Sequence, residues 1–454
     1  MPSVQESLDF LYSRINYERL SSGKGTFPFR LTRMRALLRK LDDPDRWAAT
    51  IHIGGTKGKG STAAMVAAML SAGGIRTGLY TSPHLNQLQE RFQVDGQACG
   101  DTEFVELVGI VRRAAERLER DGRGQATFFE LTTAIGWLHF YRSQCQAVVL
   151  EVGLGGRLDS TNVCFPHVCA ITSVGLDHQH ILGQTVAEIA SEKAGIIKPG
   201  IPVVTGLTDG PAWEVVAAHA ERMGAPLWKL GRDFDYSWQP GPTPWGMHVS
   251  YRATLPRGQN RDAWLVPLAG EHQAKNAAVA MAIIDTLTDV DGPSVLLPAQ
   301  RKGLAAMRCP ARIEPFPGRP TVVLDAAHND DSMAALCSVL GQATVTRPLI
   351  AVFGTSQDKD AAAQLGRLIQ VVDRVIFTHY HGNPRWRNPS ELRGIAKSLG
   401  LPDRCSEIIG DPVQALRRGR DLAGGSGHVV VSGSFFLAAE LRPLLLADQL
   451  DHNG

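Results

Sequence analysis

Short apolar runs recur along this chain of 454 residues, and each is followed by a glycine or acidic turn and then by a helical pattern. Strands that alternate with helices in this way predict parallel sheets covered by helices. The runs fall into two groups, which read ATIHI, AVVLEV, HVCAITSV and IPVVTG in the first and TVVLDAA, PLIAVFG, RVIFTHY and HVVVSGS in the second. The sequence therefore favours an α/β protein with two sheets.

The segment between the two groups has a different character. Residues 233–266 are rich in Trp, Pro and Gly and alternate in polarity, which indicates a hairpin or a small antiparallel excursion within the first domain. A helix is expected from about Glu271, and a connection with prolines follows it before new strands begin. Because the chain is too long for one typical core, we predict two domains, residues 1–300 and 301–454.

Charge and cysteine content exclude several classes of function. The 47 basic and 45 acidic residues are well mixed, so we expect no nucleic-acid partner. Seven cysteines, an odd number without CxxC pairs or zinc-ligand spacing, predict reduced thiols. The charged, amphipathic start and the lack of an apolar run of bilayer length predict a cytoplasmic protein without a membrane partner.

A glycine-rich segment, GGTKGKGS, stands between the first apolar run and a helical pattern. Glycines let backbone N–H groups curl toward an anion, and a helix N-terminus and a lysine add positive charge. The spacing G-x-x-G-K-G-S is shorter than that of the common phosphate loop, and a glycine-rich turn with surface lysines is the less favoured alternative. We predict that Lys59 binds nucleotide phosphate and that Ser61 approaches Mg²⁺ or a phosphate oxygen. Lys57 either adds charge there or points into solvent.

Three other polar residues follow or flank apolar runs. Glu151 ends the run AVVLEV, where the carboxyl edge of a parallel sheet opens into a ligand crevice, so it is a candidate metal ligand. His178 follows another such run, but Mg²⁺ prefers oxygen, so the residues alone favour a hydrogen-bonded loop histidine. Lys193 lies beside Glu192 in a helical pattern, and the residues alone favour a solvated ion-pair face.

Nine motifs occur in one order along the chain: GGTKGKGS, YTSPHL, FFELTTA, EVGLGGRLDSTN, ITSVGLDHQHILG, SEKAGIIKPG, GEHQAKNA, CPARIE and LDAAHN. With them the chain resembles the folylpolyglutamate synthase/dihydrofolate synthase family, the folate branch of the Mur-ligase-like ATP-dependent amide ligases. The resemblance covers nearly the whole chain, and the run EVGLGGRLDSTN distinguishes this branch from the peptidoglycan ligases. It implies an N-terminal P-loop Mur-ligase-like ATPase domain with a pterin site, and a C-terminal Rossmann-like glutamate-ligase domain.

The resemblance also implies an activity. A monomer would use ATP and Mg²⁺ to ligate L-glutamate to dihydropteroate, to reduced folates, or to both, through an acyl phosphate; we favour both. The first alternative is a Mur-type amide ligase acting on another carboxylate. A phosphotransferase or NTPase switch would share the loop without forming an amide, and a nucleotide-binding interaction protein would need no catalytic groups.

Roles for individual residues are implied by position within the family motifs. The implied ATP-binding residues are Gly58, Lys59, Gly60, Ser61, Asn276, Arg312 and Asp325. The implied metal ligands are Ser82, Glu151 and His178, and Lys193 matches a carbamylated lysine (N6-carboxylysine), which reverses both readings made from the residues alone. Lys59, Lys193 and His328 are the implied catalytic residues. The implied pterin-substrate residues are Arg30, Leu31, Thr32, Thr127, Phe128, Phe129, Glu130, Leu158, Asp159 and Ser160.

Three positions depart from the family pattern. Lys57 stands where Asn is common, Arg30 stands where Gly is usual, and DAAHN replaces Asp-Gly-Ala-His-Asn. None of these changes removes a group that the chemistry needs. Arg312 and Asp325 are expected on the second domain, where they would act on nucleotide held by the first, so catalysis is expected to require domain closure.

Overall fold

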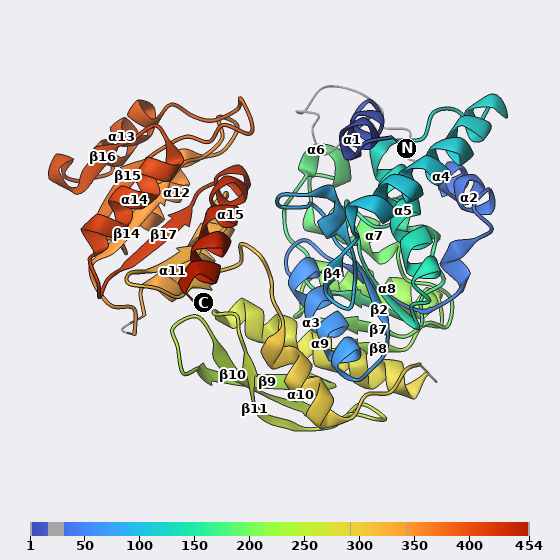
Figure 1. Cartoon of the computed structure of the whole chain (residues 1–454). Helices are drawn as coiled ribbons and strands as arrows, with labels where there is room; N and C mark the ends of the chain where they lie inside the picture. The colour runs from blue at the N-terminus through green and yellow to red at the C-terminus, as the bar shows by residue number, and fades with distance from the viewer. Residues whose placement is uncertain (1, 17–30, 291, 343, 453–454) are drawn as a thin grey trace. The chain divides into compact units, whose positions relative to one another are not determined.

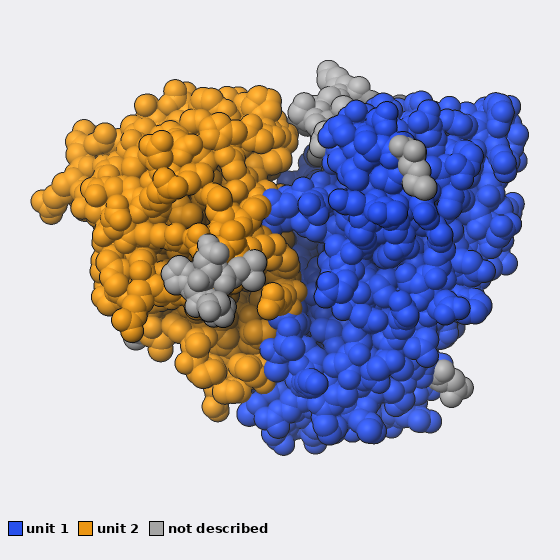
Figure 2. Space-filling model, viewed as in Figure 1, with its two compact units in different colours: residues 1–237, 249–264, 275–307 blue, residues 238–248, 265–274, 308–454 orange. Residues whose placement is uncertain are grey.

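The computed structural model describes residues 2–16, 31–290, 292–342 and 344–452 (Figure 1). The chain divides into two compact units (Figure 2). Unit 1 comprises residues 1–237, 249–264 and 275–307, and unit 2 comprises residues 238–248, 265–274 and 308–454. The domain boundary near residue 300 stays a prediction.

An eight-stranded sheet forms the centre of unit 1, in the order β4-β3-β2-β5-β1-β6-β7-β8. Pairing is parallel from β2 to β8 in this order, and β3 and β4 add an antiparallel edge. The strands are β1 Ala49–Gly54, β2 Thr77–Tyr80, β3 Phe92–Val94, β4 Gln97–Ala98, β5 Ala147–Glu151, β6 Val168–Ile171, β7 Val203–Thr205 and β8 Leu227–Lys229. The expected parallel sheet is confirmed.

The helices of this part of the chain pack against the sheet or against one another. They are α1 Val4–Tyr12, α2 Leu31–Arg39, α3 Lys59–Ala72, α4 Asp101–Arg120, α5 Phe128–Arg142, α6 Gln179–Leu182, α7 Val186–Ala194, α8 Pro211–Arg222, α9 Glu271–Asp289 and α10 Leu297–Ala306, with short 3₁₀ helices at Pro44–Arg46, Leu88–Arg91 and Ser160–Val163. Leu150, His52 and Cys169 are paired neighbours on β5, β1 and β6 and therefore share one face. Leu150 belongs to the core under α2, α4 and α5, and Cys169 to the core under α7 and α8.

The register of the central strands brings the ends of several motifs to one edge. Ile53 is paired with Glu151, and Gly54 is paired with Ile171. The glycine loop, Glu151 and the segment after β6 therefore all leave the sheet at its carboxyl edge, where parallel α/β sheets bind ligands.

A three-stranded sheet, in the order β11-β10-β9, follows the first sheet along the chain. Its strands are β9 Phe234–Pro240, β10 Met247–Ala253 and β11 Arg261–Val266, and their residues are divided between both units. Within unit 1, buried Arg261 forms an ion pair of 2.7 Å with buried Asp285 on α9 and donates to Gln300 Oε1 on α10 at 2.8 Å. This polar network fixes β11 against α9 and α10.

A six-stranded sheet forms the centre of unit 2, in the order β12-β13-β17-β14-β15-β16. Pairing is parallel except at the β12 edge. The strands are β12 Glu314–Phe316, β13 Thr321–Leu324, β14 Leu349–Phe353, β15 Arg374–Phe377, β16 Ser406–Ile408 and β17 His428–Ser432. The helices are α11 Asp330–Leu340, α12 Ala361–Leu368, α13 Pro389–Ser398, α14 Pro412–Ala423 and α15 Phe435–His452, with a 3₁₀ helix at Asp403–Cys405.

Both faces of the unit 2 sheet are covered, as the expected Rossmann-like arrangement requires. One core includes Ala351 and Val430 with residues of α11, α12 and α13. The alternate residues Val352 and Val429 lie against Gly419 of α14, where an added Cβ would be 3.3 Å from both. In the described part of the chain, none of the helices is long and apolar enough to cross a bilayer.

Candidate active site

The glycine loop joins β1 to α3, and its backbone needs glycine at two points. Gly58, the residue before α3, has φ of 85°, and a Cβ there would lie 2.3 Å from Asn276 Oδ1. Gly55 has φ of 147°, and a Cβ there would lie 2.1 Å from Thr172 Oγ1. The structure therefore brings Asn276 of α9 directly beside the loop.

Lys59 begins α3, and its side chain folds back over the loop. Its Nζ donates to the carbonyl oxygens of Gly55 at 3.1 Å and Thr56 at 3.3 Å. Burial lowers the pKa of Lys59, and Glu151 opposes this shift. Gly60 and Ser61 lie with Lys59 in the first turn of α3, so the predicted phosphate-binding residues form one continuous segment at a helix N-terminus.

The segment after β6 supports the glycine loop, which the sequence alone did not indicate. Thr56 N donates to Ser173 O at 2.7 Å, and the hydroxyl of Thr172 donates to Lys57 O at 2.7 Å. The Nζ of Lys57 forms an ion pair of 2.9 Å with Asp177, with 46% of the lysine side chain exposed. Lys57 is thus held by the acidic turn that precedes His178.

Glu151 lies at the junction of three motifs. Its Oε2 accepts a hydrogen bond of 3.0 Å from Ser82 N, after β2. A Cβ on Gly60 would be 3.3 Å from both carboxylate oxygens, so this carboxylate lies against the start of α3. A carboxylate beside a phosphate loop is an oxygen donor of the kind that Mg²⁺ takes together with substrate phosphates, and the Ser82 hydroxyl would supply a second one. Glu151 and Ser82 therefore fit the predicted metal site.

His178 precedes α6 in the left-handed backbone region, with φ of 50°. Burial lowers the pKa of His178, and Lys59, His180 and Lys193 lower it further, whereas Asp177 raises it. The influence of Lys59 and Lys193 places the imidazole in the same electrostatic neighbourhood as the phosphate loop. The low pKa favours the neutral ring, which is the form that binds metal ions.

Lys193 is buried on α7, and its Nζ donates to Gly55 O at 2.9 Å. Burial lowers the pKa of Lys193 to about 7, and the charge of Lys59 contributes to the shift. The loop after β5 packs on this helix so closely that a Cβ on Gly156 would be 3.1 Å from Lys193 Cα. The solvated ion-pair face that the residues alone favoured is therefore wrong for Lys193, although its neighbour Glu192 does pair with Arg157 at 2.8 Å.

The predicted pterin-side residues come from three segments of unit 1. Leu31 and Thr32 begin α2, Thr127 caps α5 and Phe128 to Glu130 begin it, and Leu158 to Ser160 lie after β5. The Phe129 ring covers Gly153, where a Cβ would be 2.4 Å from the ring, so the second segment touches the loop that leads from β5 to the third. Arg30 lies outside the described residues.

Glu130 organises the start of α5. Its carboxylate accepts from Thr127 N at 2.8 Å and from Arg33 Nε at 2.9 Å to each oxygen. Arg33, on α2, was not singled out from the sequence, and its ion pair joins the first two segments. Phe128 is fully buried and stacks on Tyr12 with ring centroids 5.5 Å apart, so its side chain belongs to the core.

Asp159 is held by a buried chain of hydrogen bonds. Its Oδ1 accepts from the hydroxyl of Thr161 at 2.5 Å, and its Oδ2 accepts from Leu154 N at 2.9 Å. Since the Thr161 proton is committed to Asp159, the 2.8 Å contact of Thr161 Oγ1 with His52 Nε2 requires the imidazole to donate. Burial raises the pKa of Asp159, and burial lowers the pKa of His52 to about 3. His52 was missed because a histidine inside an apolar strand carries no motif.

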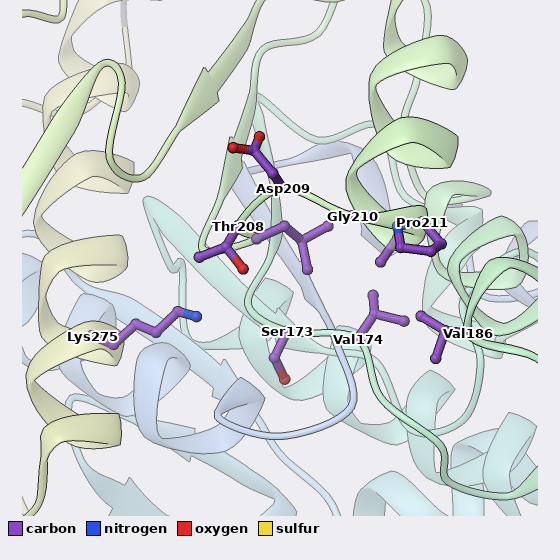
Figure 3. Close-up of a pocket in the computed structure, with 10 residues that line it drawn as sticks. Ser173, Val174, Val186, Thr208, Asp209, Gly210, Pro211 and Lys275 are labelled. Carbon is purple, nitrogen blue, oxygen red and sulfur yellow. The ribbon is translucent and has the colours of Figure 1, made fainter.

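A pocket of about 220 Å³ in unit 1 is lined in part by Ser173 and Val174, which belong to the segment after β6. Figure 3 shows Lys275 extending from α9 toward Thr208, with Ser173 and Val174 on the neighbouring segment. Ser173 also contacts Lys57 of the glycine loop, and Lys275 directly precedes Asn276. The pocket is therefore continuous with the segments that support the loop.

The remaining predicted residues lie in unit 2. Asp325 follows β13 and is buried, and its carboxylate accepts from Ile313 N and Ala327 N, each at 2.8 Å. Burial raises the pKa of Asp325, whereas Arg312 lowers it. His328 Nδ1 contacts Ala326 O at 2.9 Å. A carbonyl only accepts, so Nδ1 carries the proton in the neutral ring and Nε2 is its basic nitrogen.

Comparisons with known proteins agree with this arrangement. The family described as Mur ligase middle domain matches residues 53–284, and the family described as Mur ligase, glutamate ligase domain matches residues 311–435. A folylpolyglutamate synthase of Lacticaseibacillus casei is 35% identical over 91% of this chain and 94% of its own length. A dihydrofolate synthase/folylpolyglutamate synthase of Bacillus subtilis is 33% identical over 91% of this chain and 94% of its own length.

Solved structures show the same fold. A Mycobacterium tuberculosis folylpolyglutamate synthase, crystallised with ADP and AMPPCP, superposes with a TM-score of 0.84 at 30% identity, covering 97% of this chain and 98% of that one. These matches agree with the glycine loop and the two α/β units. The chain is therefore an ATP-dependent amide ligase and belongs to the folylpolyglutamate synthase/dihydrofolate synthase family.

Proposed function

We propose that this ligase attaches L-glutamate both to dihydropteroate and to reduced folates. The observation that carries the proposal is the position of Glu151, whose carboxylate lies against Gly60 of the phosphate loop and accepts from Ser82 N. A carboxylate that can bind a metal ion beside a phosphate loop suits the transfer of phosphate from ATP to the carboxylate of a substrate. The B. subtilis relative, which is named for both ligations, supports the bifunctional form of the proposal.

The phosphate side of the reaction is assigned to the glycine loop. Gly58, Lys59, Gly60 and Ser61 bind the ATP phosphates through backbone N–H groups, the hydroxyl and the ammonium group, and Asn276 beside Gly58 faces the adenine. Ser82, Glu151, His178 and carbamylated Lys193 would hold Mg²⁺, which when bound reduces the repulsion between the γ-phosphate and the attacking carboxylate. This residue set supplies oxygen donors and one neutral imidazole.

Lys193 suits the modification because its neighbourhood favours a neutral amine. A pKa of about 7 leaves a large neutral fraction at physiological pH, and only a neutral amine adds to CO₂. Carbamylation turns a cation beside Lys59 into an anion, so a repulsive pair becomes an attractive one. The modified side chain then offers two oxygens toward the loop.

The pterin substrate is assigned to the three joined segments of unit 1. The residues assigned to line the pterin substrate are Arg30, Leu31, Thr32, Thr127, Phe129, Glu130 and Leu158 to Ser160, whereas the Phe128 side chain belongs to the core. Arg33, Thr161 and His52 are positioning residues behind them. The Arg33–Glu130 ion pair and the His52–Thr161–Asp159 chain hold these segments before substrate binds. Such preorganisation lowers the entropic cost of aligning the carboxylate with the γ-phosphate.

Unit 2 is assigned the residues that complete the chemistry. Arg312 binds phosphate oxygens, and Asp325, fixed by two backbone N–H groups, accepts from the ribose hydroxyls. His328 accepts a proton from the attacking glutamate amine at Nε2, because its Nδ1 proton is committed to Ala326 O. We further propose that the enzyme requires Mg²⁺, acts as a monomer and is located in the cytoplasm.

Phosphate release by the purified protein tests the proposal. Mg-ATP and L-glutamate are supplied with dihydropteroate, with tetrahydrofolate or with no pterin, and the products are identified by mass. Release with both pterins and a gain of one glutamyl unit are expected. Release with one pterin restricts the activity to that substrate, and release that needs neither pterin nor glutamate contradicts the proposal in favour of an NTPase.

A further inference from the structure

Three side chains with different metal-binding atoms meet in unit 1 at a place that the proposed reaction does not use. Cys99 lies two residues before the start of α4, Glu103 lies in the first turn of α4, and His139 lies near the end of α5. One thiol, one carboxylate and one imidazole atom of these residues all lie within 4.8 Å of one another. His139 Nδ1 and Glu103 Oε1 are 2.9 Å apart.

We propose that Cys99, Glu103 and His139 bind one transition-metal ion, with Zn²⁺ as the best fit. Thiolate, imidazole and carboxylate are the ligands that Zn²⁺ takes in proteins, with a fourth position filled by water. Thiolate does not suit Mg²⁺ or Ca²⁺, which bind oxygen. The site is therefore chemically distinct from the oxygen-rich set around Glu151.

The distances require only small movements. Tetrahedral Zn²⁺ with bonds of about 2.0 to 2.3 Å separates its ligand atoms by roughly 3.3 to 3.6 Å. The most separated atoms of the cluster, at no more than 4.8 Å, need to approach by about 1 Å, and the contact between His139 and Glu103 needs to open by less. Rotation of the partly exposed Glu103 side chain supplies that freedom, since 37% of its surface is accessible.

Burial favours ion binding over a simple hydrogen-bonded pair. Cys99 and His139 are buried, with exposed fractions of 5% and 4%, so water does not compete for the thiol or the ring. Among the described residues, His139 Nε2 is a buried nitrogen without a hydrogen-bond partner. Because Nδ1 is the nitrogen that faces Glu103, a metal ion bound through Nδ1 leaves Nε2 as the protonated nitrogen of the ring.

The position of the cluster indicates a structural role. His139 lies nine residues beyond Glu130 on α5, which is about 14 Å along the helix axis. An ion at the cluster would link α4 to α5 on the side away from the pterin residues that begin α5. Its binding is therefore expected to raise stability without entering the ligation step.

Cobalt binding to the full chain tests the proposal directly. The chain is stripped of metal and titrated with Co²⁺, whose bond to a thiolate produces a charge-transfer absorption in the near ultraviolet. The ligands proposed at the active site include no cysteine, so this absorption does not report ion binding at the active site. We expect one equivalent of Co²⁺ to give the band in the wild type, Zn²⁺ to abolish it, and Cys99→Ser to lack it.

Matched variants separate the cluster from adventitious thiol binding. His139→Gln and Glu103→Gln keep the thiol and are expected to weaken Co²⁺ binding at least tenfold, and Zn²⁺ is expected to raise the Tm of the wild type but not of these variants. Cys309→Ser, at a partly exposed thiol elsewhere, should leave the band unchanged. No band in the wild type, or a band that survives in Cys99→Ser, overturns the proposal. If Cys99→Ser fails to fold, unchanged Co²⁺ affinity in Glu103→Gln overturns it.

Discussion

Lys59 and Lys193 donate from Nζ to the same acceptor, the carbonyl oxygen of Gly55, at 3.1 and 2.9 Å. Lys59 begins α3 and Lys193 lies on α7, so two amine groups from different helices contact one backbone oxygen of the glycine loop. Each cation disfavours the other, and burial together with the charge of Lys59 lowers the pKa of Lys193 to about 7. The pair is therefore stabilised when one amine loses its positive charge.

Carbamylation of Lys193 is expected to make the enzyme dependent on bicarbonate. A lysine pKa of about 7 means that the neutral fraction rises as pH rises through 7, so carbamate formation at limiting CO₂ should increase between pH 6 and 8. Activity should fall about tenfold or more when CO₂ is removed and return when bicarbonate is added. Mass spectrometry of the intact chain should detect the gain of one CO₂.

The matched variants for this prediction are Lys193→Ala and Lys198→Arg. Lys193→Ala should lose activity and regain part of it with acetate or formate, because a small carboxylate can occupy the place of the carbamate. Lys198, which is partly buried and donates to Asn162, should tolerate arginine with the bicarbonate response unchanged. Full activity of Lys193→Ala without any added carboxylate would contradict the prediction.

The two lysines of the glycine loop should differ sharply on substitution. Lys59→Met removes the charge that we propose for binding the ATP phosphates and should lower kcat by about 10²-fold or more. Lys57→Asn removes only a partly exposed ion pair with Asp177, a kind of interaction worth about 0 to 1 kcal/mol, so kcat/KM should change less than about fivefold. Steady-state phosphate release measures both, and a larger loss in Lys57→Asn would assign Lys57 to catalysis.

His52 should make the folded state sensitive to mild acid. Its folded pKa of about 3 lies below the unfolded value near 6.5, so the unfolded chain binds the extra proton and stability is lost as pH falls below 6.5. Between pH 7.5 and 5.5 this one group should remove about 1.4 kcal/mol from the free energy of unfolding. Urea unfolding of the wild type and His52→Gln at both pH values measures the difference in slope. Equal losses in the two proteins would contradict the prediction.

The His52 chain also has a kinetic consequence. Thr161→Val removes the hydroxyl that links His52 to Asp159 and leaves the buried carboxylate with one hydrogen bond fewer. We expect the KM for the pterin substrate to rise about tenfold while the KM for ATP stays unchanged, because Asp159 lies with the pterin residues. Thr161→Ser, which keeps the hydroxyl, is the control. A rise in both KM values would indicate general damage to unit 1.

The sequence alone indicates those site residues whose place follows from a local pattern of strand, loop and helix. Lys59 follows from the order of strand, glycine loop and helix, and Glu151 follows from its place at the end of a parallel strand. The partners of these motifs depend on tertiary structure: Lys57 and Asp177 are 120 residues apart, Arg33 and Glu130 are 97 apart, and His52 and Thr161 are 109 apart. Lys193 shows the same limit, because burial and the nearby Lys59 set its pKa, and neither is visible in a short motif.

The buried ion pair between Arg261 and Asp285 should control the stability of unit 1. Both side chains are almost fully buried, and Arg261 also donates to Gln300, so removing one partner leaves an uncompensated charge in the core. Arg261→Met should destabilise the protein by about 3 to 5 kcal/mol, and the double variant Arg261→Met/Asp285→Leu should recover much of that loss. Arg252→Met, at an exposed pair with Asp262 on the neighbouring strands, should change stability by less than about 1 kcal/mol. Urea unfolding followed by tryptophan fluorescence measures all three, and a double variant no more stable than Arg261→Met would mean that packing around the pair, rather than the unpaired charge, sets the loss.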